Sequence, residues 1–165
     1  MFTDVPNDQF DLKKIDLYIK QNFPYVATSD FDLTVGKAYY VGYDPNHLIK
    51  LDLFHTDPFV FEKMVLDKIR MVNMKEIVAM KLEVIQNIGR KKDFWDIYEL
   101  ENYFTFQEML EFHEIRYPYS HDRGLIINNF TKFEKADEES DPNCLKGNFW
   151  DVIKFDMVNW INKYK

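Results

Sequence analysis

The stretch MKEIVAMKLEVIQNIGRKKDFWDIYELENYF, residues 74–104, decides the fold. Its apolar residues recur every three or four positions, which is the spacing of amphipathic helices. Asn73 directly precedes it and is a good N-cap, and Gly89 is typical of the position just beyond a helix end. We therefore predict one helix that begins at Asn73 and ends near Gly89, and a second that begins near Asp93.

Further helices are predicted on either side of this stretch. Thr105 and Glu108 have the spacing of a capping box, which predicts a helix that ends before Pro118. Helical spacing also marks residues 11–23 and 148–164, and residues 121–133 predict a short helix or turn. In the predicted last helix, an amphipathic one, the residues near one face are Phe149, Val152, Ile153, Asp156, Trp160 and Ile161.

Strands are predicted between the first helix and residue 72. Residues 25–43 are rich in β-branched and aromatic side chains and contain two glycines, which predicts one or two strands. Residues 47–54 alternate, and this pattern places Ile49, Leu51 and Leu53 on the core face. The order predicts an α+β fold, with a partial α/β region over residues 1–72 and a helical region over 73–165, packed as one compact unit.

Composition excludes several classes of protein. Lys and Arg number 21 against 28 Asp and Glu, a formal charge of −7, so the chain has no general footprint for nucleic acid. No apolar run reaches the roughly 18–20 residues that a membrane span requires, and the N-terminal residues lack the pattern of a signal peptide. Cys144 is the only cysteine, which suits a reducing compartment. We therefore expect a cytoplasmic protein with no membrane contact.

Lys81 is the most informative candidate for function. Motifs of nucleophilic hydrolases, P-loops, Rossmann domains and zinc fingers are absent. Lys81 falls within the apolar stripe of the helix that begins at Asn73. Either its stem packs while its ammonium group reaches the surface, or the ammonium group points into a cleft and binds a phosphate as a compact charge.

Asp52 is a second candidate, because it lies between Leu51 and Leu53 on a predicted strand. Strict alternation places it on the solvent face. A carboxylate beside a cleft could instead hold Mg²⁺, which prefers oxygen ligands. His55 and Asp57 follow closely, but without a further ligand we do not expect a transition-metal site.

The third candidate is the sequence RKKDFWD, residues 90–96, in which Asp93 and Asp96 lie three positions apart on one helix face. Asp93 could simply cap the helix while Asp96 favours its dipole. Alternatively, both could belong to a ligand site beside Lys92. We expect His113 and His121 to be ordinary surface or packing histidines, and residues 134–141 to form a solvated acidic loop.

Taken in order, these segments resemble the AbiEii/AbiGii toxin family of nucleotidyltransferases, the toxins of type IV toxin–antitoxin and abortive-infection systems. The resemblance rests on a strand with an aspartate, then AMKL at residues 79–82, then RKKDFWDIY at residues 90–98. It covers most of residues 1–115 and is weaker beyond Tyr117. It implies a partial nucleotidyltransferase fold for the N-terminal region.

The resemblance also implies roles for individual residues. Lys81, with Lys92 nearby, would bind the phosphates of a nucleoside triphosphate. Asp93 and Asp96 match the family's K-D-x-x-D acidic pair, and Asp52 matches the carboxylate on the central strand, so these three are the expected catalytic residues. Asp52 is also the expected ligand of Mg²⁺, which bridges phosphates and neutralises charge during nucleotidyl transfer.

The chain also departs from the family. Members open with a Gly-Gly or Gly-Ser turn and then a D-x-D strand, whereas this sequence begins MFTD, as if at the end of that strand. We therefore expect nucleotidyl transfer to be impaired in this chain. The alternative is a non-catalytic fold remnant that acts as a protein-interaction module, with an antitoxin or a second copy of itself as partner.

Overall fold

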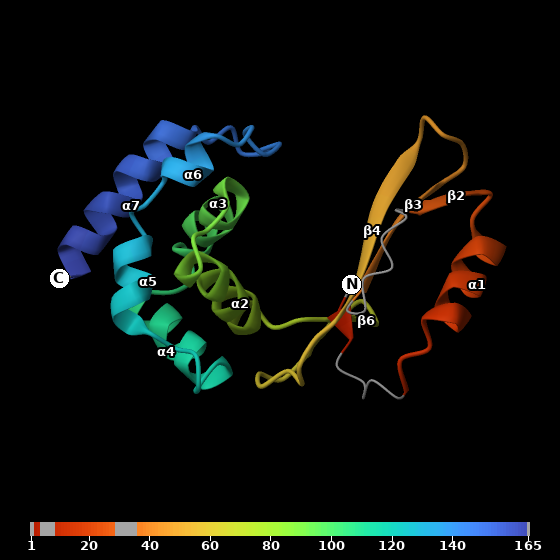
Figure 1. Ribbon diagram of the computed structural model, residues 1–165, viewed down its shortest axis with the longest axis horizontal. Coiled ribbons are helices and arrows are strands. Elements are labelled where there is room, and N and C mark those ends of the chain that lie inside the picture. Colours follow the sequence, from red (N-terminus) through yellow and green to blue (C-terminus); the bar gives the residue numbers. More distant parts are fainter. Residues whose placement is uncertain (1, 4–8, 29–35, 165) are drawn as a thin grey trace. The chain divides into compact units, whose positions relative to one another are not determined.

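The computed structural model describes residues 2–3, 9–28 and 36–164. Its residues divide into two compact units, Met1–Phe59 and Val60–Lys165, and each unit is described here by itself. The predicted division after residue 72 falls inside the second unit. Strands dominate the first unit and helices the second (Figure 1), so the predicted α+β fold class is confirmed.

The first unit contains one helix and a four-stranded sheet. Its elements are β1 (Phe2–Thr3), α1 (Leu12–Asn22), β2 (Tyr25–Thr28), β3 (Gly36–Gly42) and β4 (Leu48–His55). The strand order is β1-β4-β3-β2, with β1 parallel to β4 and the other neighbours antiparallel. The predicted helix and strands of this region are confirmed, and Asp11 caps α1 by accepting from the Lys14 N–H at 3.0 Å.

Helix α1 covers one face of this sheet. Its buried Ile19 packs with three buried side chains of the sheet, Tyr39, Val41 and Leu53. Cross-strand partners share a face, so Asp52, which pairs with Ala38, lies on the face away from α1. The predicted core face of β4 holds for Leu51 and Leu53 but is wrong for Ile49, which is 73% exposed although its cross-strand partner Val41 is buried.

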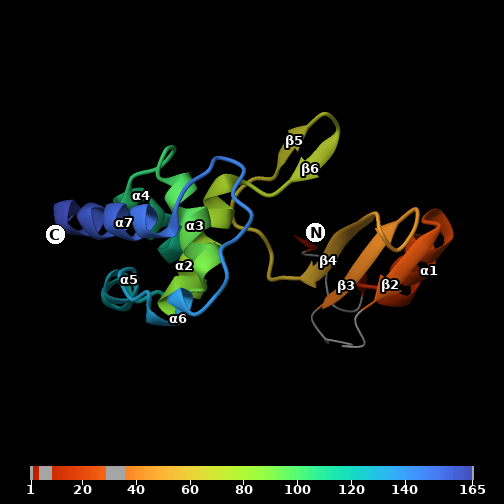
Figure 2. The ribbon, with the colours of Figure 1, turned by 90° about the horizontal axis from the view of Figure 1, so that it is seen from above.

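The second unit consists of a β-hairpin and six helices (Figure 2). Its elements are β5 (Met64–Leu66), β6 (Ile69–Met71), α2 (Met74–Gln86), α3 (Lys91–Leu100), α4 (Phe106–Arg116), α5 (Arg123–Asn129), α6 (Glu134–Asp137) and α7 (Trp150–Tyr164). Helix α2 lies at the centre, in contact with α3, α4 and α5, and α7 packs against α3. No helix among the described residues is both long and apolar enough to cross a membrane.

The connection between α2 and α3 differs from the prediction. Asn73 caps α2 as predicted, by accepting from the Lys75 N–H. The left-handed residue after α2 is Ile88, with φ 68°, rather than Gly89. Gly89 is needed for close packing instead, because a Cβ there would lie 2.9 Å from Ile85 and 3.0 Å from the Phe94 ring.

Helix α3 begins earlier than predicted. Its first residue is Lys91 and its N-cap is Arg90, whose extended backbone ends the turn from α2. Asp93 is therefore the third residue of the helix, and the interpretation of Asp93 as a cap is wrong. The capping box of Thr105 and Glu108 is confirmed at the start of α4.

Three features of the second unit were not anticipated. The β5–β6 hairpin turns through Asp67 and Lys68, both with positive φ, without the glycine that usually marks such a turn. The buried face of α7 comprises Trp150, Ile153, Met157 and Ile161, so the predicted face is rotated and Phe149 and Val152 are exposed. The predicted acidic loop contains α6, and Glu139 and Asp141 within it contact the buried Lys91.

Candidate functional site

Lys81 bridges two carboxylates of the neighbouring helix. It projects from α2, and its Nζ lies 2.8 Å from Asp93 Oδ1 and 2.5 Å from Asp96 Oδ2, both on α3. Asp93 and Asp96 therefore share a face of α3, as their spacing predicts. The side chain of Lys81 is 24% exposed, so its ammonium group does not extend freely into solvent.

Asp93 is fully buried at the centre of this cluster. Its Oδ1 binds Lys81, and its Oδ2 accepts from Arg90 Nε at 2.8 Å. Both carboxylate oxygens are thus engaged by cations, one from α2 and one from the residue that begins α3. This geometry makes Asp93 the group that fixes Lys81 and Arg90 relative to each other.

The titration of this cluster follows from its contacts. Burial alone would lower the pKa of Lys81, but its hydrogen bonds to Asp93 and Asp96 hold that pKa above the ordinary value. Burial alone would raise the pKa of Asp93, but the hydrogen bonds from Arg90 and Lys81 hold it below the ordinary value. Lysine and carboxylate are therefore both charged at neutral pH.

The cluster has an exposed side. The side chains of Asp96 and Arg90 are 50% and 48% exposed, whereas that of Asp93 is fully buried. Two cations face two carboxylates, so the four side chains balance in charge. An anion that approaches Lys81 would compete with the solvent-screened Asp96 rather than with the buried Asp93. Lys92 is exposed, and no ion pair involves it among the residues the structure describes.

Asp52 lies in the first unit, on the face of the sheet away from α1. Its side chain is 32% exposed and pairs with Lys50 Nζ at 3.0 Å on the same face of β4. Because each unit is described by itself, the predicted proximity of Asp52 to Lys81 stays a prediction. The roles expected of Lys81, Lys92, Asp52, Asp93 and Asp96 likewise stay predictions.

The described residues do not by themselves fit a magnesium ion. No group of three or more His, Cys, Asp or Glu side chains within residues 9–28 and 36–164 is arranged to hold a metal. Asp52 offers a single carboxylate, already paired with Lys50, and the oxygens of Asp93 are already engaged by two cations. No catalytic step is therefore derived through Mg²⁺.

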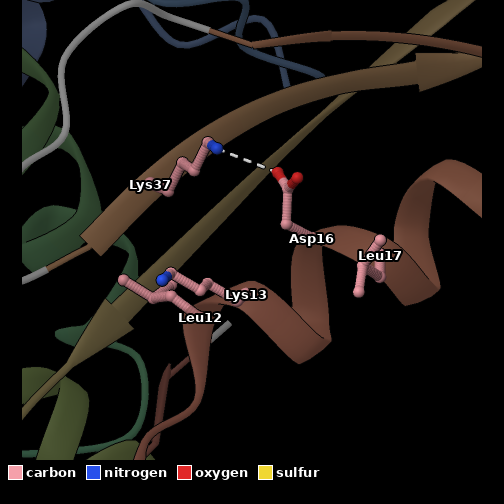
Figure 3. Close-up of a pocket in the computed structure, with 5 residues that line it drawn as sticks. All are labelled: Leu12, Lys13, Asp16, Leu17 and Lys37. Atoms are coloured by element: carbon pink, nitrogen blue, oxygen red, sulfur yellow. Dashed lines mark hydrogen bonds and ion pairs between the residues drawn. The ribbon is translucent and has the colours of Figure 1, made fainter.

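A shallow pocket in the first unit lies between α1 and β3 (Figure 3). Its lining residues are Leu12, Lys13, Asp16, Leu17 and Lys37. Asp16 Oδ1 accepts from Lys37 Nζ at 2.8 Å and from the Tyr39 hydroxyl at 3.2 Å. Lys20 and Lys37 together lower the pKa of Asp16 to about 2. These charges join α1 to the sheet, so we assign them a structural role.

His113, expected to be a surface or packing histidine, is buried in the second unit, and its contact with Glu83 was not anticipated. His113 is fully buried, with Nε2 2.9 Å from Glu83 Oε2 and Nδ1 2.8 Å from His121 Nδ1. Burial, followed by the effect of His121, lowers the pKa of His113 to about 4. The spacing of Glu83 and His113, on different helices, gives no local signal for this contact.

Comparison with protein-family models identifies one family. The family model described as the nucleotidyl transferase AbiEii toxin of type IV toxin–antitoxin systems matches residues 7–146. Among solved structures, the chain is similar to one from H. pylori that is described provisionally as a nucleotidyltransferase, with 14% identity and a TM-score of 0.46. That match covers 86% of this chain and 65% of the H. pylori chain. This chain therefore spans slightly less than two thirds of the length of the H. pylori protein. A search of curated proteins found no match.

Proposed function

This chain belongs to the AbiEii family of nucleotidyl transferase toxins, and on that premise we propose that its helical unit binds the phosphates of a nucleoside triphosphate through Lys81. The observation that carries the proposal is the position of Lys81. Its ammonium group is charged, partly sheltered and oriented by a buried carboxylate, yet its second partner Asp96 is half exposed. A phosphate can replace Asp96 as the counterion without disturbing Asp93.

The residues around Lys81 have different proposed roles. Asp93 holds Lys81 and Arg90 in place through both of its oxygens. Asp96 is the counterion of the Lys81 ammonium group while no ligand is bound. Once a phosphate has replaced it, Asp96 remains beside the ligand as a negative charge. Lys92, exposed on the first turn of α3, supplies a second cation for the phosphates.

Asp52 is the proposed carboxylate of the metal-binding region, and it needs partners beyond the described residues. Among the described residues, no other carboxylates are arranged with Asp52 to hold a metal. We therefore propose that residues 1–165 are impaired in nucleotidyl transfer.

The family's place in toxin–antitoxin systems makes an antitoxin the expected counterpart of this chain. We further propose that the chain acts in the cytoplasm, where nucleoside triphosphates are abundant. Fractionation of cells that express the tagged chain tests this location directly.

The binding proposal is tested by titration of ATP, GTP, CTP and UTP, with and without Mg²⁺, by isothermal calorimetry. Wild-type protein is expected to bind at least one nucleotide, and Lys81→Met is expected to weaken that affinity about tenfold or more. Lys75→Met is the matched control, because Lys75 is an exposed lysine on the same helix. Equal affinity in wild type and Lys81→Met, or no binding by wild type, overturns the proposal.

Assays of Mg²⁺-dependent label transfer by residues 1–165 test the impairment. We expect no transfer above background. Robust Mg²⁺-dependent transfer by residues 1–165 would contradict this part of the proposal.

A further inference from the structure

Lys91, the middle cation of the RKK sequence, is buried at the start of α3. Its backbone N–H donates to Glu139 Oε2 at 3.0 Å, and its Nζ lies 3.0 Å from Asp141 Oδ1. Nζ also donates to the backbone carbonyl of Glu139 and lies 5.5 Å from the centroid of the Trp150 ring. Lys91 therefore fastens residues 139–141 to the first turn of α3.

This fastened segment lines a surface pocket beside the candidate site. The pocket has a volume of about 520 Å³, within the range of small-molecule sites. Its lining residues are Arg90, Lys92, Glu139, Ser140, Asp141 and Pro142. Two cations, Arg90 and Lys92, and two carboxylates, Glu139 and Asp141, thus line the same pocket. A cation that is paired with a carboxylate attracts an anionic ligand less strongly than an unpaired one, so the pairing determines which cation can bind the ligand.

The three consecutive cations have different partners. Arg90 pairs with the buried Asp93, and Lys91 pairs with Asp141. Lys92 has no ion pair within the described ranges and lines the pocket. Among the described residues, Lys92 is therefore the one of the three cations that pairs with no carboxylate, and it remains so as long as Asp141 is held by Lys91.

We propose that Lys91 is a positioning residue that keeps the carboxylate of Asp141 away from Lys92, so that Lys92 can bind phosphate. This inference rests on the proposed function, because it concerns the same nucleotide site. Without the Lys91 ammonium group, the Asp141 carboxylate loses its cation partner in a pocket that Lys92 also lines. It would then compete with an anionic ligand for Lys92.

The test is a charge cycle measured by calorimetric titration of ATP and of inorganic tripolyphosphate at low salt. Lys91→Met is expected to weaken both affinities about tenfold, as contacting charged groups commonly do. Asp141→Asn is expected to leave them unchanged or tighter, and the double variant to return close to wild type. All differences are expected to shrink at 1 M salt. A purely structural role for Lys91 would not produce rescue by Asp141→Asn.

Two controls accompany the cycle. Asp137→Asn removes the same charge from the same acidic segment, but Asp137 pairs with Lys154 and accepts from Trp150 Nε1, so we expect unchanged affinity. Lys91→Arg keeps the charge and should retain binding. Thermal melts establish that each variant is folded, and the exposed Asp141 provides a decisive variant even if Lys91→Met unfolds.

The outcomes separate the two proposals. If wild type binds neither ligand, the proposed function and this inference both fail. If wild type binds and either Lys91→Met binds equally well or Asp141→Asn weakens binding, this inference alone is overturned.

Discussion

The two units differ in how deeply their ion pairs are buried. In the first unit, the Lys50–Asp52 pair is 54% and 32% exposed on an open sheet face. In the second, Glu76 and Arg116 are 0% and 5% exposed and still form an ion pair. Exposed pairs contribute little to stability, whereas removal of one partner from a buried pair leaves an uncompensated charge. The Asp16–Lys37 pair of the first unit is 19% exposed at each side chain, so the Glu76–Arg116 pair of the second unit is buried far more deeply.

The cores differ in size as well. Four buried apolar residues form the core of the described first unit, whereas the core of the second includes all the buried apolar residues of its helices. A small sheet covered by one helix has little apolar area to stabilise it. We expect the helical unit to determine the stability of the chain, and the following experiments test that contrast.

The largest effect is expected from Glu76→Ala. Glu76 pairs with Arg116 at 2.5 Å and also accepts from the Val60 and Phe61 N–H groups at 3.2 and 3.1 Å. Its removal should lower the free energy of unfolding by about 3–5 kcal/mol, because Arg116 loses its buried partner. Urea denaturation followed by circular dichroism measures the loss. Lys50→Met, in the exposed pair of the first unit, should be indistinguishable from wild type; an equal loss in both variants would remove the contrast between the units.

A second effect concerns pH and His113. Its pKa in the folded chain is about 4, lowered from 6.5 by burial and then by His121. Between these values the unfolded chain binds a proton that the folded chain does not, so stability falls as pH decreases from about 6.5 to 4, by about 3 kcal/mol. Denaturation curves across this range measure the slope.

The matched variant for that experiment is His113→Gln, which should flatten the slope. The variant is necessary because burial raises the pKa of Glu83, the carboxylate that faces His113, and this favours the folded state as pH falls. An identical slope in wild type and His113→Gln would assign the pH dependence to other groups.

A smaller effect separates the two carboxylates of the candidate site. Asp93→Asn should lower stability by about 2 kcal/mol, because Lys81 and Arg90 both lose the charge of their fully buried acceptor. Asp96→Asn should leave the melting temperature unchanged, because Asp96 is half exposed, and should alter nucleotide affinity instead. Thermal melts and calorimetric titrations on both variants make the comparison. If Asp93→Asn leaves the stability of the protein unchanged, Asp93 contributes no more than an ordinary acidic residue in the first turn of a helix.

The smallest effect is a gain in stability from Ile88→Gly. Ile88 has a left-handed backbone and is 51% exposed, so its side chain adds strain and little burial. Glycine should raise stability by about 1 kcal/mol. Ile88→Ala is the control, since it removes the same apolar atoms but keeps a Cβ in the strained conformation. Equal melting temperatures for the two variants would indicate that no strain is stored at this turn.

Local patterns predicted most of the fold. Helical spacing, the capping box at Thr105 and the alternation of β4 depend on neighbouring residues, and all three are found in the structure. The β5–β6 hairpin was missed because Asp67 and Lys68 adopt the turn without glycine or asparagine. The register of α7 was missed because apolar residues occur all around it, so its sequence does not single out the buried face.

The candidate site was predictable only as a set of residues. The position of Lys81 in an apolar stripe and the spacing of Asp93 and Asp96 are visible in the sequence. The assignment of Asp93 as a buried partner of two cations depends on how α2 packs against α3. The same holds for the Glu76–Arg116 and Lys91–Asp141 pairs, which join residues 40 and 50 positions apart. The local sequence around a charged residue does not indicate which distant residue it will pair with.

The parallel pairing of β1 with β4 has a consequence for biosynthesis. Phe2 emerges from the ribosome about 50 residues before its partner Phe54. At a translation rate of roughly 5–20 residues per second, that delay is on the order of 3–10 s. During this time the nascent chain exposes an unpaired strand, which chaperones or other nascent chains can engage. Slower translation of residues 48–55 should therefore lower the yield of folded first unit while leaving the later helices unaffected.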